Sequence, residues 1–134
     1  MKKKILLVED DPLLIDIYTT KLQDAGFVVS VATDGQIALE LFEKDKPDLI
    51  LLDIVLPNIN GWEVLRQIKE AGDTTKVVIL SNLGQKEEIE KGIKLGADKY
   101  LIKANYTPSE VVEEIKKLLR KVIKNFLRNY FRQQ

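Results

Sequence analysis

Short apolar runs alternate along this chain with longer segments in which apolar residues recur every three or four positions. The runs occupy residues 4–8, 27–32, 48–52, 77–80 and 99–102. They lack a polar residue at every second position, which is typical of strands that are buried on both faces. The segments between them have the spacing of amphipathic helices. Five alternating strand and helix units of this length predict an α/β fold, a parallel sheet with right-handed crossovers and helices on both faces.

Capping signals mark where several of these helices begin and end. Asp11–Pro12 begins the first helix, with the aspartate as N-cap and the proline in the first turn. Gly26 ends that helix. Thr107, followed by Pro108 and by Glu110, begins the last helix as a capping box.

The last helical pattern continues beyond the fifth unit, because apolar residues keep returning on one broad face. We expect a single helix from Ser109 to about Phe131; the alternative is a helix that frays after Arg120. The chain is accordingly divided into a domain at residues 1–120 and a basic amphipathic helical extension at 121–134. An exposed apolar strip on the extension would mark an interface. Its members are Val122, Phe126, Leu127, Tyr130 and Phe131.

The composition favours one soluble domain. The chain has 134 residues, of which 45% are hydrophobic, enough for a substantial core. No apolar run approaches the roughly 20 residues that span a bilayer. Cysteine is absent, so there are no disulfides or thiol chemistry, and we expect a cytoplasmic location. Histidine is also absent. The chain therefore cannot carry a phosphohistidine itself, and any such phosphoryl donor must be another molecule.

The net charge of zero conceals an asymmetry. Residues 1–115 carry 14 basic and 21 acidic residues, a net charge of −7, whereas residues 116–134 carry seven basic residues and no acid. A basic extension on an acidic body indicates an interaction element. A homodimer through this helix is the first expectation, and an anionic membrane surface is a less favoured alternative. No nucleic-acid partner is expected, because the sequence contains no second DNA-reading helix module.

Polar side chains follow four of the apolar runs, namely Glu9–Asp10, Asp53, Ser81 and Lys103. Ligands of open parallel sheets bind at the carboxyl ends of the strands, so these side chains are expected to meet. Three carboxylates there would repel one another unless a hard cation such as Mg²⁺ or Mn²⁺ held them together. A hydroxyl and an ammonium group nearby suit an incoming oxyanion. The pattern predicts a magnesium-dependent phosphoryl acceptor.

Simpler interpretations exist for the individual acids. Asp10 and Asp11 can cap a helix, and Asp53 can bond loop amides at the end of its strand. Nucleotide binding is not supported, because the sequence contains neither GxxxxGK[ST] nor GxGxxG.

Over about residues 3–120 the chain resembles the receiver domain of two-component response regulators. The resemblance rests on ILLVEDD at 5–11, DLILLDIVLP at 48–57, NG at 60–61, VVILS at 77–81 and GADKYLIK at 96–103. It implies a flavodoxin-like (βα)5 doubly wound fold whose five parallel strands have the order 2-1-3-4-5, here with an extended C-terminal helix.

The resemblance also implies roles for the acidic residues. Asp53 is the expected phosphoacceptor. Asp10 and Asp53 would bind Mg²⁺ directly, together with the backbone carbonyl of Val55. Glu9 would act on the metal through water.

Three further residues would respond to the phosphoryl group. Ser81 would bond an acyl-phosphate oxygen, and Lys103 would pair with it. Tyr100 matches the aromatic switch of the family, which turns inward as the hydroxyl residue moves; otherwise it is a half-buried aromatic residue of an edge strand.

The expected function is that of a stand-alone receiver that accepts a phosphoryl group on Asp53 from a histidine kinase or phosphotransfer protein. It would signal through the surface of the fourth helix, fifth strand and fifth helix. Such a protein is not an enzyme in the ordinary sense, because it catalyses only its own phosphotransfer and autodephosphorylation. The alternatives are a phosphorylation-independent adaptor and a dimerisation or membrane-surface module that acts through the C-terminal helix.

The sequence departs from the family pattern at three positions. Ala104 stands where most relatives have proline; a cis bond before a non-proline residue costs roughly 2.5–4 kcal/mol. Lys103–Ala104 is therefore either trans with a shifted loop or a strained cis bond. Asn82 follows Ser81 in place of a small residue and could crowd the phosphoryl group. Lys99 replaces an acid of the DNA-binding subfamily, which weakens transfer of that subfamily's dimer mode.

Overall fold

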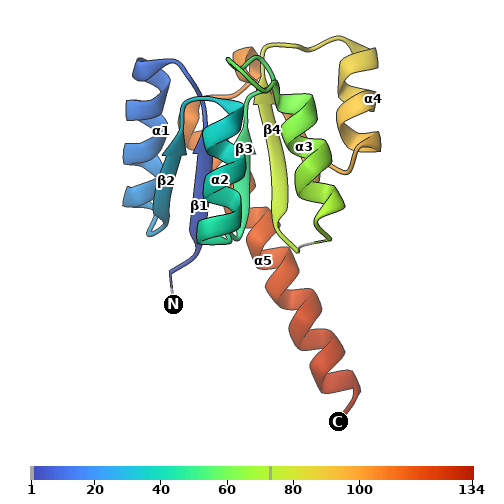
Figure 1. The fold of residues 1–134 in the computed structure, drawn as a ribbon. Coiled ribbons are helices and arrows are strands. Elements are labelled where there is room, and N and C mark those ends of the chain that lie inside the picture. The colour runs from blue at the N-terminus through green and yellow to red at the C-terminus, as the bar shows by residue number, and fades with distance from the viewer. Residues whose placement is uncertain (1, 73) are drawn as a thin grey trace.

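The computed structural model describes residues 2–72 and 74–134, and for Val122 it describes the backbone alone. It confirms the predicted α/β fold, a parallel sheet in the order β2-β1-β3-β4-β5 (Figure 1). The strands are β1 (Lys4–Val8), β2 (Val28–Ala32), β3 (Leu49–Leu52), β4 (Lys76–Ser81) and β5 (Lys99–Ile102). The helices are α1 (Pro12–Asp24), α2 (Gly35–Asp45), α3 (Gly61–Glu70), α4 (Lys86–Lys94) and α5 (Pro108–Arg132), with a 3-10 turn at Lys103–Asn105.

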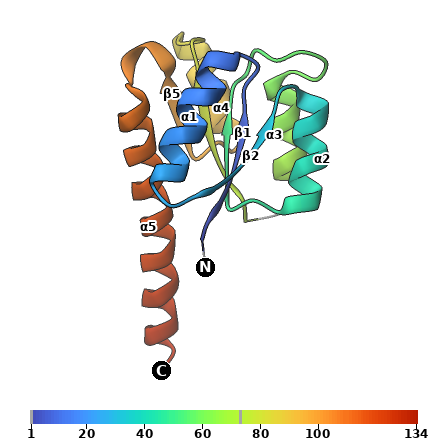
Figure 2. The same cartoon turned by 90° about the vertical axis from the view of Figure 1, so that its left-hand side faces the viewer.

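Alternate residues of the central strands face two different helical layers. In β1, Ile5 and Leu7 belong to the core formed with α1 and α5, whereas Leu6 and Val8 belong to the core formed with α2 and α3. Figure 2 shows these two pairs of helices on opposite sides of the sheet. Both faces of the strand are therefore apolar, which explains why the runs show no alternation with polar residues.

A glycine sets the distance between the end of β3 and the start of α3. The Gly61 amide donates to the Ile54 carbonyl at 2.8 Å, directly beyond the strand. A Cβ atom at Gly61 would lie 2.5 Å from the backbone oxygen of Asp53, far inside van der Waals contact. Asn60 caps the helix by accepting from the Glu63 amide at 3.2 Å. These contacts fix the loop that carries Asp53.

The C-terminal helix α5 has two parts. Its first half packs against α1 and the sheet through Val111, Val112, Ile115 and Leu119. Its second half continues without a break and extends away from the body of the protein (Figures 1 and 2). The predicted continuous helix is confirmed, and fraying after Arg120 is wrong. In the described part of the chain, no helix combines the length and the apolar character needed to cross a membrane.

The predicted capping box at the start of α5 is present. The Thr107 hydroxyl accepts from the Glu110 amide at 3.1 Å, and the Glu110 carboxylate accepts from the Thr107 amide at 2.9 Å. These bonds also lower the pKa of Glu110. They satisfy backbone donors that a helix N-terminus leaves without intrahelical partners.

Thr107→Ala is expected to lower the free energy of unfolding by about 1 kcal/mol, because the cap is lost while the fold is kept. Urea unfolding followed by circular dichroism would measure it. Ser109→Ala, an exposed change in the first turn of the same helix, is the control and should cost less than about 0.5 kcal/mol. Equal losses in the two variants would contradict the capping role.

Candidate functional site

The parallel register brings the ends of the central strands to one edge of the sheet. The Asp53 amide donates to the Val8 carbonyl at 3.0 Å, so Asp53 lies beside Glu9, which follows β1. Ser81 ends β4 opposite Ile102, the last residue of β5, and Lys103 comes next. Residues from four separate βα units thus converge, as expected for the carboxyl ends of parallel strands.

Glu9, Asp10 and Asp53 form an acidic cluster. Oxygen atoms from the three carboxylates lie within 4.8 Å of one another. Glu9 and Asp53 are buried, whereas Asp10 is exposed at the opening of the site. One Glu9 oxygen accepts from the amides of Asp10 and Asp11 at 3.1 Å each, which fixes the turn that presents Asp10.

Lys103 connects two of these carboxylates. Its Nζ lies 2.8 Å from Asp53 Oδ2 and 2.7 Å from Glu9 Oε1. Burial alone would lower the pKa of Lys103, but hydrogen bonds and charge attraction from Asp53 and Glu9 outweigh burial and raise it. The ammonium therefore stays charged. Buried ionic groups need such compensation, because removing one partner leaves the other charge unpaired.

The peptide bond after Lys103 is trans, because the described residues contain no cis bond. Of the two alternatives for Lys103–Ala104, the trans bond is the one present. The chain turns through the 3-10 helix at Lys103–Asn105, with the Ala104 side chain exposed. Proline at 104 is therefore not required for the lysine to reach Asp53.

The charges and donor atoms of the cluster fit a divalent cation. Three carboxylates and one ammonium give a formal charge of −2, and carboxylate oxygens are the ligands that Mg²⁺ and Mn²⁺ prefer. The Val55 amide donates to Asp53 Oδ1 at 3.3 Å, and the Val55 side chain is exposed. The use of the Val55 carbonyl as a metal ligand stays a prediction.

A short chain of hydrogen bonds runs from Ser81 to Tyr100. The fully buried Ser81 accepts from the Leu83 amide at 3.3 Å, and the Tyr100 hydroxyl donates to the Leu83 carbonyl. The Tyr100 ring packs against the core on the side of α2 and α3, so it already lies inward. Burial, followed by the charges of Glu88 and Asp53, raises the pKa of Tyr100. Sequence reasoning missed Leu83, because it acts through its backbone, which has no sequence signature.

Gly92 of α4 leaves space for this ring. A Cβ atom there would lie 2.9 Å from Cδ2 of Tyr100 and 2.8 Å from Cδ1 of Ile79. Sequence reasoning also missed Gly92, because a glycine inside a helix by itself indicates only weaker helix formation. The contact depends on how α4 lies on β4 and β5.

A hollow of about 410 Å³ opens beside Lys103. Asn82 and Ala104, both exposed, lie on its lining. Buried Tyr18 of α1 also lines it; burial raises the Tyr18 pKa, while the Lys103 charge lowers it and the Glu9 charge raises it. Tyr18, a buried residue of the core, thus lies near the site. The other residues that line the hollow are Leu14, Tyr106 and Pro108.

Comparisons with known proteins agree with this geometry. The sequence profile described as response regulator receiver domain matches residues 5–116. The probable transcriptional regulatory protein SilR of Salmonella typhimurium is 40% identical over 117 residues, which are 87% of this chain and 51% of SilR. The Francisella response regulator 1452 receiver domain is 30% identical with a TM-score of 0.84, covering 90% of this chain and 99% of that one. A CheY-like receiver domain protein from Methanospirillum hungatei is 28% identical with a TM-score of 0.87, covering 93% of this chain and 99% of that one.

The chain spans about half the length of the curated relatives that it matches. These relatives are described as transcriptional regulatory proteins. They do not support the expectation that no nucleic acid is involved.

Lys103→Gln is expected to raise the affinity of the site for Mg²⁺ about tenfold, roughly 1.4 kcal/mol. The substitution removes the lysine ammonium group, which competes with Mg²⁺ for the carboxylates of Asp53 and Glu9. Isothermal titration calorimetry with MgCl₂ would measure it. Lys99→Gln removes a lysine paired instead with Glu114 at 2.9 Å and should leave the affinity unchanged. Weaker binding to the Lys103 variant would contradict this account of the charges.

Gly92→Ala is expected to displace the Tyr100 ring and break its bond to Leu83, so that the pKa of Tyr100 falls toward its usual value near 10. Tyrosinate absorbance would follow the titration, with Tyr100→Phe identifying the Tyr100 component. Lys94→Ala, an exposed change on the same helix, is the control. An unchanged Tyr100 pKa in Gly92→Ala would contradict this expectation, because it would mean that α4 moves to make room for the added methyl group while the Tyr100 ring keeps its position.

Proposed function

The chain belongs to the response regulator receiver domain family, and from this membership we propose that it accepts a phosphoryl group on Asp53 from the phosphohistidine of a histidine kinase or phosphotransfer protein. One observation carries the proposal. The buried Asp53 carboxylate lies beside Glu9 and Asp10 and is hydrogen-bonded to Lys103. A solitary strand-end carboxylate that only bonds loop amides would need neither the ammonium nor the other two acids.

The proposed reaction transfers one phosphoryl group between two nucleophiles. An Asp53 oxygen forms a bond to phosphorus while the bond from phosphorus to the donor imidazole nitrogen breaks. The electron pair of that bond stays on the imidazole, which takes up a proton from solvent. Bonds from Val55 N–H to Oδ1 and from Lys103 to Oδ2 orient the carboxylate before the donor arrives.

Charge neutralisation is the main catalytic requirement, because a carboxylate must approach an anionic phosphoryl group. Asp10 and Asp53, with the Val55 carbonyl and with Glu9 through water, would hold Mg²⁺ or Mn²⁺. When bound, the cation would supply positive charge that offsets the repulsion between the carboxylates and the phosphoryl group. Lys103 bonds Glu9 as well as Asp53, so it can transfer one bond to a phosphoryl oxygen while it keeps the other.

The bonds around Leu83 support a route for the signal. A phosphoryl oxygen would accept a hydrogen bond from the Ser81 hydroxyl, whose oxygen at the same time accepts from the Leu83 amide. The Leu83 carbonyl in turn holds Tyr100. Because the ring already lies inward, phosphorylation would act by tightening this chain of bonds. The affected surface would be that of α4, β5 and α5.

Ala104 and Asn82, two of the departures from the family pattern, are the residues that would permit the alternative of a phosphorylation-independent adaptor. Ala104 no longer favours it, because Lys103 reaches Asp53 through a trans bond. Since the matched relatives are about twice as long, the proposal concerns the receiver step, and action as a stand-alone protein stays a prediction. Self-association through α5 is a separate proposal, because it depends on other residues.

Phosphorylation at Asp53 can be tested with phosphoramidate, a small donor with the same phosphorus–nitrogen bond as phosphohistidine. Intact-mass spectrometry should show the addition of one phosphoryl group in the presence of Mg²⁺ and none after EDTA. Asp53→Asn should abolish the addition, because it removes the nucleophile. Asp16→Asn, an exposed change on α1, should retain it.

Hydroxylamine distinguishes the chemistry of the product. It should remove the group, because acyl phosphates react with it whereas phosphoserine and phosphotyrosine do not. A group that persists in Asp53→Asn, or one that resists hydroxylamine, would assign the phosphoryl group to another residue.

A further inference from the structure

The last three turns of α5, residues 121–132, are here called the tail, and they present two exposed surfaces, one apolar and one basic. The first is apolar, with exposed fractions from 43% for Ile123 to 68% for Phe126. Its other members are Leu127, Tyr130 and Phe131. Positions 123, 126, 127, 130 and 131 follow the spacing i, i+3, i+4, i+7, i+8, so they form one face of the helix. A contiguous exposed face of this kind usually marks an interface.

The second surface is a basic stripe beside the apolar face. Its members, Lys121, Lys124, Arg128 and Arg132, also recur at helical spacing, and the sequence has no acid after Glu114. The tail therefore suits a partner that is apolar in its centre and acidic at its edge. Direct pairing of two tails is electrostatically unfavourable, because it would bring two sets of positive charges together without any compensating acid.

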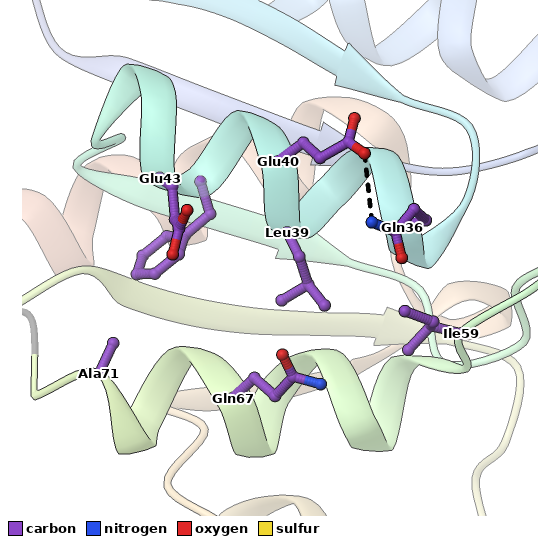
Figure 3. Close-up of a pocket in the computed structure, with 8 residues that line it drawn as sticks. Gln36, Leu39, Glu40, Glu43, Ile59, Gln67 and Ala71 are labelled. Carbon is purple, nitrogen blue, oxygen red and sulfur yellow. Dashed lines mark hydrogen bonds between the residues drawn. The ribbon is translucent and has the colours of Figure 1, made fainter.

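The protein itself carries a surface with the complementary chemistry, between α2 and α3. A hollow of about 330 Å³ lies there, the size of a small ligand pocket, with Leu39, Phe42 and Ile59 among its lining residues. Figure 3 shows Leu39 pointing from α2 toward α3, with Glu40 and Glu43 on the same helix. The described residues that line this hollow include these two glutamates and no lysine or arginine.

Other hollows on the described surface are less suitable for a basic helix. The hollow near Leu119 and Ile123 is lined by Lys3, Lys46 and Lys76 against a single acid, Asp48. The hollows beside α1 and beside α4 each contain two lysines and two acids, and the one beside the acidic cluster contains Lys103. Of these five, the hollow between α2 and α3 alone has a wholly acidic set of charged residues.

We propose that the tail of a second copy of this chain docks on the groove between α2 and α3. The apolar face would enter between Leu39 and Ile59, and Lys124 and Arg128 would approach Glu40 and Glu43. The partner tail must come from another molecule, because α5 lies on the opposite side of the sheet from α2 and α3 and runs away from the body (Figures 1 and 2). The proposal does not depend on phosphorylation of Asp53.

Sedimentation velocity over a range of protein concentrations tests the proposal on the full chain. The wild type should show a weight-average mass that rises above the monomer mass. Glu40→Lys with Glu43→Lys should weaken self-association at least tenfold, and so should Lys124→Glu with Arg128→Glu. All four side chains are exposed, so the fold should be retained. Glu87→Lys with Glu90→Lys, on exposed positions of α4, is the matched control and should associate like the wild type.

Mixing the two variants identifies the contact. Each variant alone should associate at least tenfold more weakly than the wild type. A mixture of the two should associate more strongly than either variant alone, because the basic tail of the groove variant meets the intact acidic groove of the tail variant. Combining all four substitutions in one chain should also restore association by reversing both charges. Only a contact between tail and groove gives this pattern.

Three results would overturn the proposal. A wild type that stays monomeric throughout would remove it. Association that is lost in the tail variant but unchanged in the groove variant would mean that the tail binds another surface. Co-sedimentation of a monomeric wild type with anionic phosphatidylglycerol vesicles, but not with phosphatidylcholine vesicles, would make a lipid surface the occupant of the tail.

Discussion

Lys103 is the centre of the site, because it holds together carboxylates that would otherwise repel one another. Parallel strands end at the same edge of the sheet, so the acids that follow β1 and β3 are forced close together by the topology. The ammonium bonds both Glu9 and Asp53, which makes their burial tolerable. It leaves a formal charge of −2 once exposed Asp10 is counted, and this residual charge is what a divalent cation can neutralise. The proposed metal binding and the proposed phosphoryl transfer both depend on this arrangement.

The site is linked to the protein surface through backbone atoms. The amide and the carbonyl of Leu83 face Ser81 and Tyr100 respectively, so one loop residue contacts both. The ring can lie inward because Gly92 has no side chain to oppose it. The positions of Ser81, Leu83 and Tyr100 are therefore interdependent, which is the property that a local charge change needs if it is to reach α4 and β5.

The helix α5 serves two purposes along its length. The same amphipathic pattern first covers the sheet and then continues into solvent, where its apolar residues are exposed. Because the acids end at Glu114, the exposed half is also strongly basic. The complementary acidic groove between α2 and α3 belongs to the opposite side of the sheet, which favours contact between molecules over contact within one.

The sequence determined the fold class, the order of the elements and most of their boundaries. Apolar runs identified strands buried on both faces, and local signals such as Asp11–Pro12 and the Thr107 capping box marked helix starts, because these features depend on residues close together in the chain. It also indicated which acids and which lysine stand at strand ends, and so which residues the topology would bring together. The tertiary structure alone decided the trans bond after Lys103, the bridge through Leu83, the space left by Gly92 and the location of Tyr18. Each of these depends on the distance between segments that are far apart in sequence, and no local pattern encodes such a distance.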